Sequence, residues 1–235
     1  MSISEDGLRK NQANFASLSP LSFLERTRKT FPNQTAIEYK DYKLSYKQAG
    51  QRCDALANLI KNQNFNSGST IAVMLPNIPV MWECHFGVPM ATGVLNAINT
   101  RLDSHTVQFI LEHGEAKLFI YDSEYSPIVE KALENLKNPP TVIEFVDEVA
   151  GNKRSNFANK VNCLDYETEL KNFTGTTFEH VLPNDEWNSI ALNYTSGTTG
   201  NPKGVVYHHR GAYLNAIGNS LTWDLPMHPK YLWTL

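Results

Sequence analysis

The sequence feature that most constrains the fold is a short apolar run from Thr70 to Leu75, which lies between Gly68 and Pro76. After Thr70 every residue of the run is hydrophobic, so it lacks the alternation of a strand with one wet face. The residue before a proline is biased toward extended backbone, which favours a strand ending at Leu75. A short, wholly apolar strand is typical of a parallel sheet covered by helices on both faces.

Helices and strands alternate on both sides of this run. Ser45 offers a helix N-cap, and apolar residues recur at three-and-four spacing from Tyr46 to Ile60, which predicts an amphipathic helix. Similar signals predict helices over residues 79–91, 104–113 and 127–136, and strands over 94–97, 117–121 and 141–145. This alternation predicts an α/β fold with a mainly parallel sheet. The polar stretch 151–160 is predicted to be a surface loop.

Composition limits the partners and the compartment. The 235 residues carry a formal net charge of -3, which leaves no global cationic field for binding nucleic acid. The three cysteines, Cys53, Cys84 and Cys163, form no C-x-x-C pair, so neither a disulfide framework nor a zinc site is expected. The N-terminal region lacks the apolar core of a signal peptide, and the most apolar stretch, 71–95, is interrupted by prolines and charged residues. We therefore expect a cytoplasmic protein with no transmembrane segment and no nucleic-acid partner.

The segment most informative about function joins two strand-like runs. Residues 189–193 lead into YTSGTTGNPKG at 194–204, and Val205 and Val206 follow. Glycines permit positive φ and let backbone N–H groups converge on an anion, while hydroxyls add donors and Lys203 adds charge. These are the properties of a polyphosphate-binding loop. Its glycines and hydroxyls are Thr195, Ser196, Gly197, Thr198, Thr199, Gly200 and Gly204.

Two other kinds of loop share parts of this pattern. A Walker-A loop has the form G-x-x-x-x-G-K-S/T, but Pro202 stands where its second glycine belongs, and Gly204 follows Lys203 where Ser or Thr should stand. A flexible Gly/Thr surface loop would explain mobility, but not why glycines, hydroxyls and a lysine alternate between two apolar strands. Polyphosphate binding is therefore the favoured interpretation.

The segment 194–204 resembles the signature loop of the adenylate-forming superfamily, which includes acyl-CoA synthetases, luciferases and peptide-synthetase adenylation domains. Two upstream segments, LSYKQA at 44–49 and GVPMATGVLN at 87–96, resemble further motifs of this superfamily and occur in the same order. The second of these segments and VVYHHRGAY at 205–213 are more similar to stand-alone acyl-CoA synthetases than to peptide synthetases. The resemblance covers essentially the whole chain.

This resemblance implies a two-step reaction that uses ATP, Mg2+ and coenzyme A. A fatty or other carboxylic acid attacks the α-phosphate of ATP to give an acyl-adenylate and pyrophosphate, and the thiol of coenzyme A then displaces AMP. The resemblance assigns catalytic roles to Lys203 and Thr199, and it places Thr195 next to magnesium. No proton shuttle is needed, because a carboxylate is ionised at pH 7, so His208 and His209 are predicted to be structural. The expected phosphate contacts are Thr195, Ser196, Gly197, Thr198, Thr199, Gly200 and Lys203.

The same resemblance implies that residues 1–235 form a partial N-terminal AMP-binding domain, the first half of the large N-terminal domain of an adenylate-forming enzyme. The family's adenine and ribose motifs, hinge and small C-terminal domain have no counterpart in this sequence, so we expect the chain alone to be inactive. The segment from Tyr231 to Leu235 is predicted to be a buried strand. Two alternatives to an acyl-CoA ligase stay open: a non-catalytic nucleotide-binding module, and an adenylating enzyme with a different acyl acceptor.

Overall fold

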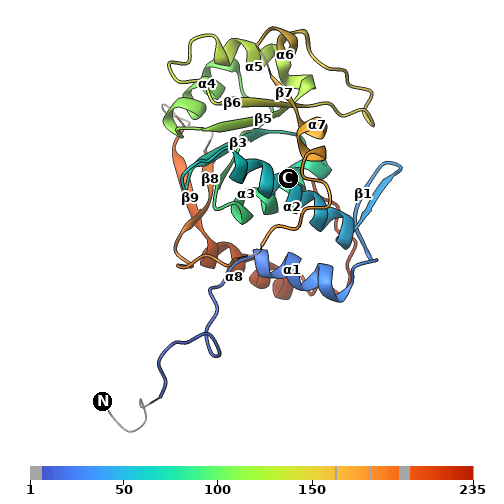
Figure 1. Cartoon of the computed structure of the whole chain (residues 1–235), viewed down its shortest axis with the longest axis vertical. Helices are drawn as coiled ribbons and strands as arrows, with labels where there is room; N and C mark the ends of the chain where they lie inside the picture. The colour runs from blue at the N-terminus through green and yellow to red at the C-terminus, as the bar shows by residue number, and fades with distance from the viewer. Residues whose placement is uncertain (1–6, 162, 180, 196–201, 235) are drawn as a thin grey trace.

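The computed structural model describes residues 7–161, 163–179, 181–195 and 202–234. Within these residues, a seven-stranded sheet with the strand order β7-β6-β5-β3-β4-β8-β9 forms the centre of the molecule (Figure 1). Each neighbouring pair is parallel except β8 and β9, so the predicted mainly parallel sheet is confirmed. The strands are β3 (Thr70–Met74), β4 (Val94–Ala97), β5 (Leu118–Asp122), β6 (Thr141–Phe145), β7 (Leu164–Asp165), β8 (Ser189–Tyr194) and β9 (Gly204–His208).

Helices cover both faces of this sheet (Figure 1). One face packs against α2 (Tyr46–Asn62), α3 (Pro79–Met90) and α7 (Tyr166–Lys171), and the other against α4 (Ser104–His113), α5 (Ser126–Leu133) and α6 (Asn156–Lys160). The remaining elements are α1 (Leu21–Thr30), which packs on α2 and α3, the hairpin of β1 (Thr35–Tyr39) and β2 (Tyr42–Ser45), the 3-10 turn η1 (Ser123–Tyr125), and α8 (His209–Thr222).

Strand β3 shows why the run at 70–75 has to be apolar throughout. Ile71 and Val73 belong to the core beneath α2 and α3, whereas Ala72 and Met74 belong to the core beneath α4 and α5. Successive side chains of a strand point to opposite faces, so a central strand with helices on both sides has no solvent-exposed side chain. The prediction made from this run is therefore confirmed.

The strand order identifies the carboxyl ends of the central strands as a place where ligands can bind. From β3 the chain first adds β4 on one side and then crosses over to add β5 on the other. Because crossovers between parallel strands are right-handed, this reversal puts α3 on one face and α4 and α5 on the other. In doubly wound sheets, ligands bind at the carboxyl ends of the strands where such a reversal occurs.

The predicted helix starts match the structure. The hydroxyl of Ser45 accepts a hydrogen bond from the N–H of Gln48, and the Gln48 side chain accepts one from the N–H of Ser45, which forms a capping box at the start of α2. Helix α4 is capped by Asp103, whose Oδ1 accepts from the N–H of Thr106 at 2.8 Å. Local sequence thus fixes where both helices begin.

The loop predicted at 151–160 contains a short helix instead. Helix α6 begins after Ser155, whose hydroxyl accepts from the N–H of Ala158 at 3.0 Å. Phe157 and Ala158 are buried against the core beneath α5. Two adjacent apolar residues are too few to give a periodic signal, so the contact with α5 could not be predicted from the polar composition of the segment.

The buried strand predicted at Tyr231–Leu235 is wrong for the part that the structure describes. Residues 231–234 lie in neither a helix nor a strand, and Tyr231 is 60% exposed and Leu232 81% exposed. The ring of Tyr231 stacks on that of Trp223, with 6.1 Å between the ring centroids. Tyr231 and Leu232 therefore lie on the surface, whereas Trp233 is partly buried and packs against the core beneath α2 and α3.

The contact between α2 and α3 depends on a glycine. A Cβ atom at Gly87 of α3 would lie 2.8 Å from Leu56 Cδ2 and 3.0 Å from Leu56 Cβ on α2. Because a rotation of the Leu56 side chain cannot move its Cβ, the helices would have to separate. We expect Gly87→Ala to lower the free energy of unfolding by about 1–3 kcal/mol, as overpacking in cores does, in urea titrations followed by circular dichroism.

A matched control is Gly218→Ala in α8, where a Cβ would meet nothing within 4 Å. Alanine is the better helix former, so this change should stabilise the chain by up to about 1 kcal/mol. Equal effects of the two substitutions would contradict the steric explanation for Gly87.

Candidate functional site

The predicted strand–loop–strand segment is a β-hairpin. Strands β8 and β9 pair antiparallel, and Tyr194 stands opposite Gly204 in the register. Beyond this pair, the N–H of Thr195 donates a hydrogen bond to the carbonyl oxygen of Lys203 at 3.0 Å. The two ends of the predicted phosphate-binding loop are thus held together at its base.

The structure describes only part of the predicted phosphate site. Thr195 and Lys203 are exposed, and the Lys203 ammonium has no carboxylate partner among the described residues. Both residues lie at the base of the β8–β9 hairpin. The predicted phosphate contacts that lie outside the described residues are Ser196, Gly197, Thr198, Thr199 and Gly200.

The hairpin places this loop at the carboxyl ends of the parallel strands. Strand β8 runs parallel to β4, with Ala191 opposite Leu95, so Thr195 follows the carboxyl end of a parallel strand. The reversal of strand order between β3 and β5 leaves a crevice at these same carboxyl ends. A phosphate chain held by the loop would therefore lie over the carboxyl ends of the central strands.

Side chains from β4 and α4 hold β8 in place, and neither contact was predicted from the sequence. Asn96 of β4 donates from Nδ2 to the carbonyl oxygen of Leu192 at 3.0 Å. At the end of the strand, the hydroxyl of Tyr194 lies 2.7 Å from Nδ1 of His113, the last residue of α4. These partners are far apart in sequence, and neither Asn96 nor His113 belongs to a local motif that assigns it this role.

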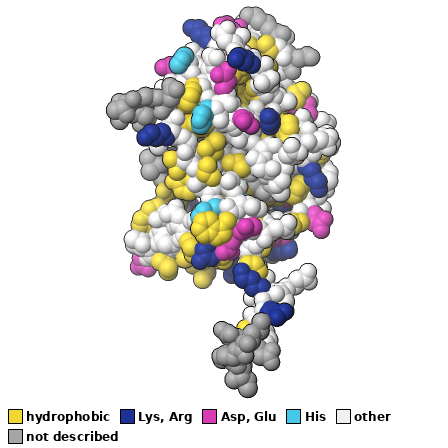
Figure 2. Space-filling view, turned by 90° about the vertical axis from the view of Figure 1, so that its left-hand side faces the viewer, with side chains coloured by type: hydrophobic (Ala, Val, Ile, Leu, Met, Phe, Trp, Pro, Cys, Tyr) yellow, Lys and Arg dark blue, Asp and Glu magenta, His cyan; other side chains and the backbone are white. Residues whose placement is uncertain are grey.

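On its other side, β8 pairs with the edge strand β9. Val205, Val206 and Tyr207 are 41%, 60% and 47% exposed, so side chains on both faces of β9 reach solvent. Figure 2 views the molecule from this side and shows hydrophobic side chains gathered on it. The carboxyl end of β8 is therefore held mainly from the side of β4 and α4.

The two histidines after the hairpin are structural, as predicted. His208 caps α8, because its Nδ1 accepts from the N–H of Gly211 at 2.8 Å. His209 is buried, and its Nδ1 lies 2.9 Å from the hydroxyl of Ser19. Burial lowers the pKa of His209 to about 4, which keeps the ring neutral at pH 7.

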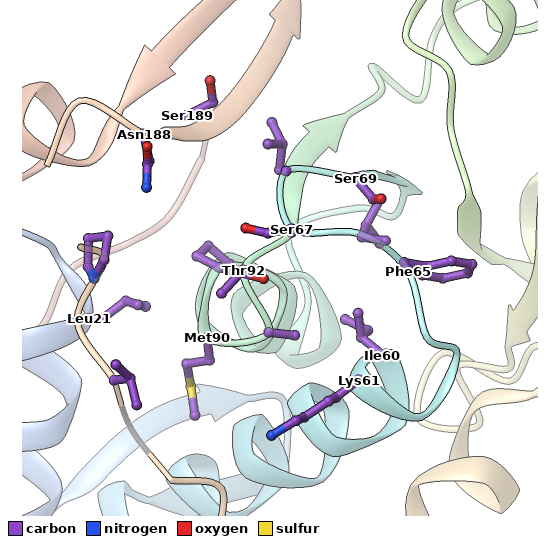
Figure 3. A pocket seen from close by; sticks show the side chains of 18 of the residues that line it. Leu21, Ile60, Lys61, Phe65, Ser67, Ser69, Met90, Thr92, Asn188 and Ser189 are labelled. Carbon is purple, nitrogen blue, oxygen red and sulfur yellow. The ribbon is translucent and has the colours of Figure 1, made fainter. Parts of the chain in front are cut away.

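A cavity of about 640 Å³ lies at the opposite edge of the sheet from the loop. Its lining includes Ser69, Gly93 and Ser189, which precede or open β3, β4 and β8. In Figure 3, Lys61 reaches into it from the end of α2. The charges of Lys61 and Glu179 oppose each other in the lining, and the other polar groups are neutral, so the cavity has no preference for a polyanion.

The described residues supply few ligands for a metal ion. No group of three or more His, Cys, Asp or Glu side chains in the described part of the chain is arranged to hold one. Thr195 offers a hydroxyl oxygen at the base of the loop, which is a type of ligand that Mg2+ accepts together with water and phosphate oxygens. Among the described residues, Thr195 is thus the predicted magnesium neighbour whose position the structure gives.

A doubly wound α/β sheet with a glycine- and hydroxyl-rich loop at the carboxyl ends of its strands is an architecture found in many nucleotide-binding proteins. The family model described as "AMP-binding enzyme" matches residues 24–235, and the chain belongs to this family. Acetate–CoA ligase CCL3 of Humulus lupulus is 39% identical over 98% of the chain. Acetate/butyrate–CoA ligase AAE7, peroxisomal, of Arabidopsis thaliana is also 39% identical over 98% of the chain.

These relatives are much longer than the chain, which spans 42% of the length of each. Among solved structures, anthranilate CoA ligase AuaEII in complex with anthranoyl-AMP matches with a TM-score of 0.74 at 21% identity. That match covers 86% of this chain and 37% of the ligase. At this level of identity the likeness confirms the fold, which is that of part of an adenylate-forming CoA ligase.

The expected cytoplasmic location is contradicted by the relatives. The Arabidopsis relative is peroxisomal by name, and so is a trans-cinnamate:CoA ligase of Petunia hybrida. The expectation was based on reduced cysteines and the lack of a signal peptide, and these features do not separate cytosol from other reducing compartments. Among the described residues, no helix combines the length and hydropathy needed to span a bilayer.

Proposed function

We propose that this chain is part of an ATP-dependent acyl-CoA ligase, which activates a carboxylic acid as an acyl-adenylate and passes the acyl group to coenzyme A. The observation that carries the proposal is the β8–β9 hairpin, which joins Thr195 and Lys203 at the carboxyl edge of the sheet. Relatives named as CoA ligases, 39% identical over 98% of the chain, support the same reaction.

In this proposal, the loop acts on the leaving group. The exposed ammonium of Lys203 binds an oxygen of the β- or γ-phosphate and neutralises the charge that develops on pyrophosphate. Thr195 and Thr199 would donate hydroxyls to the phosphates, and Thr195 would help to hold a magnesium ion brought in with ATP. That ion, when bound, would supply positive charge to offset the charge of the phosphates. The loop thereby orients the α-phosphate for attack by the carboxylate, and no covalent intermediate with the protein is formed.

The acid that is activated belongs to a broad class. The named relatives act on acetate, butyrate and trans-cinnamate, and the solved ligase acts on anthranilate. We propose a short aliphatic, fatty or aromatic carboxylic acid for this chain.

The greater length of the relatives supports a proposal for the role of the chain within the enzyme. Because the chain spans 42% of two relatives, we propose that residues 1–235 form a partial N-terminal AMP-binding domain. A domain without the remaining part of the enzyme would bind phosphate but would complete neither half-reaction.

The test is ATP–pyrophosphate exchange, run on the 235-residue chain and on the full-length enzyme that contains it under this proposal. We expect the full-length enzyme to exchange label with at least one of acetate, butyrate, octanoate and cinnamate, and to release product only with coenzyme A. The short chain should be silent. Exchange that needs another acceptor for product release would favour a different adenylating enzyme, and nucleotide binding without exchange by any acid would favour a binding module.

A further inference from the structure

The base of the phosphate loop is tied to helix α4 by one hydrogen bond. The hydroxyl of Tyr194 and Nδ1 of His113 are 2.7 Å apart, which is within the range of a well-formed hydrogen bond. Burial raises the pKa of the half-buried Tyr194, so the phenol keeps its proton at neutral pH. The contact joins residues 81 positions apart, and it lies directly before Thr195.

Aromatic packing orients both partners of this bond. The ring of Phe109, one turn earlier in α4, stacks on His113, with 5.2 Å between the ring centroids. The same ring meets Tyr194 edge-on at 6.4 Å, and His113 meets Tyr194 edge-on at 5.7 Å. At Gly114, a Cβ would lie 3.3 Å from the Tyr194 hydroxyl and 2.8 Å from the carbonyl oxygen of Ile110, so the helix end lies close against the phenol.

Helix α4 is a firm support for this contact. Its N-terminus is capped by Asp103, and Val107, Ile110 and Leu111 are at most 3% exposed in the core beneath it. The edge strand β9, in contrast, is exposed on both faces. Together with β4, whose Asn96 binds the carbonyl oxygen of Leu192, the helix can therefore fix the end of β8 in a way that the exposed strand β9 cannot.

We propose that His113 is a positioning residue for nucleotide binding: through Nδ1 it holds the Tyr194 hydroxyl and so fixes the base of the loop that presents Thr195 and Lys203. The inference rests on the proposed function, because it assumes that this loop binds phosphate. His113 itself is not expected to touch the nucleotide. Its effect passes through Tyr194, the residue paired with Gly204 at the end of the hairpin.

The test compares binding of ATP and of inorganic pyrophosphate to variants of the 235-residue chain by isothermal titration calorimetry with magnesium present. His113→Leu and Tyr194→Phe should each weaken binding by about 3- to 10-fold, the range set by one neutral hydrogen bond. Because both substitutions remove the same hydrogen bond, the double variant should bind no more weakly than whichever single variant has the lower affinity. Asn places its amide close to the position of Nδ1, so His113→Asn should bind almost as the unchanged chain does, whereas His113→Gln should not.

Unfolding by urea is measured on every variant to separate positioning from stability. A residue that is merely structural changes the unfolding midpoint, but it leaves the affinity of a fully folded chain unchanged. His105→Leu, at the exposed first turn of the same helix, is the matched control and should change neither.

The outcomes separate this inference from the function on which it rests. If the unchanged chain binds ATP and pyrophosphate in a manner that requires Lys203, but His113→Leu and Tyr194→Phe bind equally well, the positioning role is overturned alone. The positioning role would also be overturned if the loss of affinity in the double variant equalled the product of the losses in the two single variants. If the unchanged chain shows no binding that depends on Lys203, the phosphate-loop function is wrong and the role of His113 is wrong with it.

Discussion

Arg52→Met should lower the free energy of unfolding by about 3–5 kcal/mol, the cost of leaving one member of a buried ion pair without its partner. Glu83 of α3 is fully buried, and Arg52 of α2 donates to its Oε1. Arg52 also binds Glu167 of α7 at 2.6 Å, and Tyr166 donates its hydroxyl to Glu83 Oε2 at 2.8 Å. Three helices are joined by this network, so its loss is expected to affect the whole domain.

The loss caused by Arg52→Met should also increase with pH. Burial raises the pKa of Glu83 above its ordinary value, although Arg52 opposes the shift. Between the unfolded and folded pKa values the folded chain binds more protons, so stability falls as pH rises through that window. Without Arg52 the folded pKa of Glu83 rises further, and the window extends upward. Urea titrations should therefore show a larger loss near neutral pH than at about pH 5.

Two further variants test whether the unpaired charge of Glu83 causes the loss of stability. Glu83→Gln placed in the Arg52→Met background removes the unpaired charge and keeps an acceptor for Tyr166, so it should restore much of the stability. Lys43→Met breaks the exposed pair with Glu38 and should leave the unfolding midpoint unchanged. A double variant as unstable as Arg52→Met alone would show that the buried charge is not the cause.

Lys203→Ala should weaken the binding of ATP and pyrophosphate by about 10- to 100-fold. A charge-assisted hydrogen bond contributes about 1.5–3 kcal/mol, and each 1.4 kcal/mol is a factor of ten in affinity. Lys203 is exposed at the base of the hairpin, where its carbonyl oxygen accepts from the N–H of Thr195. Because that bond uses the backbone, the substitution removes the charge and leaves the hairpin intact. Calorimetric titration with each ligand measures the change.

Lys117→Ala is the control, since Lys117 is an exposed lysine at the amino end of β5, on the opposite edge of the sheet. Its binding constants should equal those of the unchanged chain. Lys203→Arg keeps the charge and should lose less than Lys203→Ala. An affinity that is the same with and without the Lys203 side chain would mean that the loop does not bind phosphate through this residue.

The sequence predicted the central architecture because the relevant signals are local. The period of apolar residues, the capping side chain Ser45 and the apolar run at 70–75 each act over one or two turns or strands. It also predicted two strands flanking the loop, since the motif and both strands are contiguous, whereas their antiparallel pairing came from the structure. The errors occurred where a segment is defined by its neighbours. Phe157 and Ala158 reach the core despite polar surroundings, and Tyr231 stays exposed despite apolar ones.

The sequence by itself determined the class of fold, the family and the chemical character of the loop, because spacing and residue type are sufficient to specify them. Only the tertiary structure decided which side chains support that loop. Asn96, His113 and the pair of Arg52 and Glu83 act on residues between 31 and 96 positions away. Such contacts depend on strand order and on helix packing over both faces of the sheet, and no local pattern in the chain encodes them.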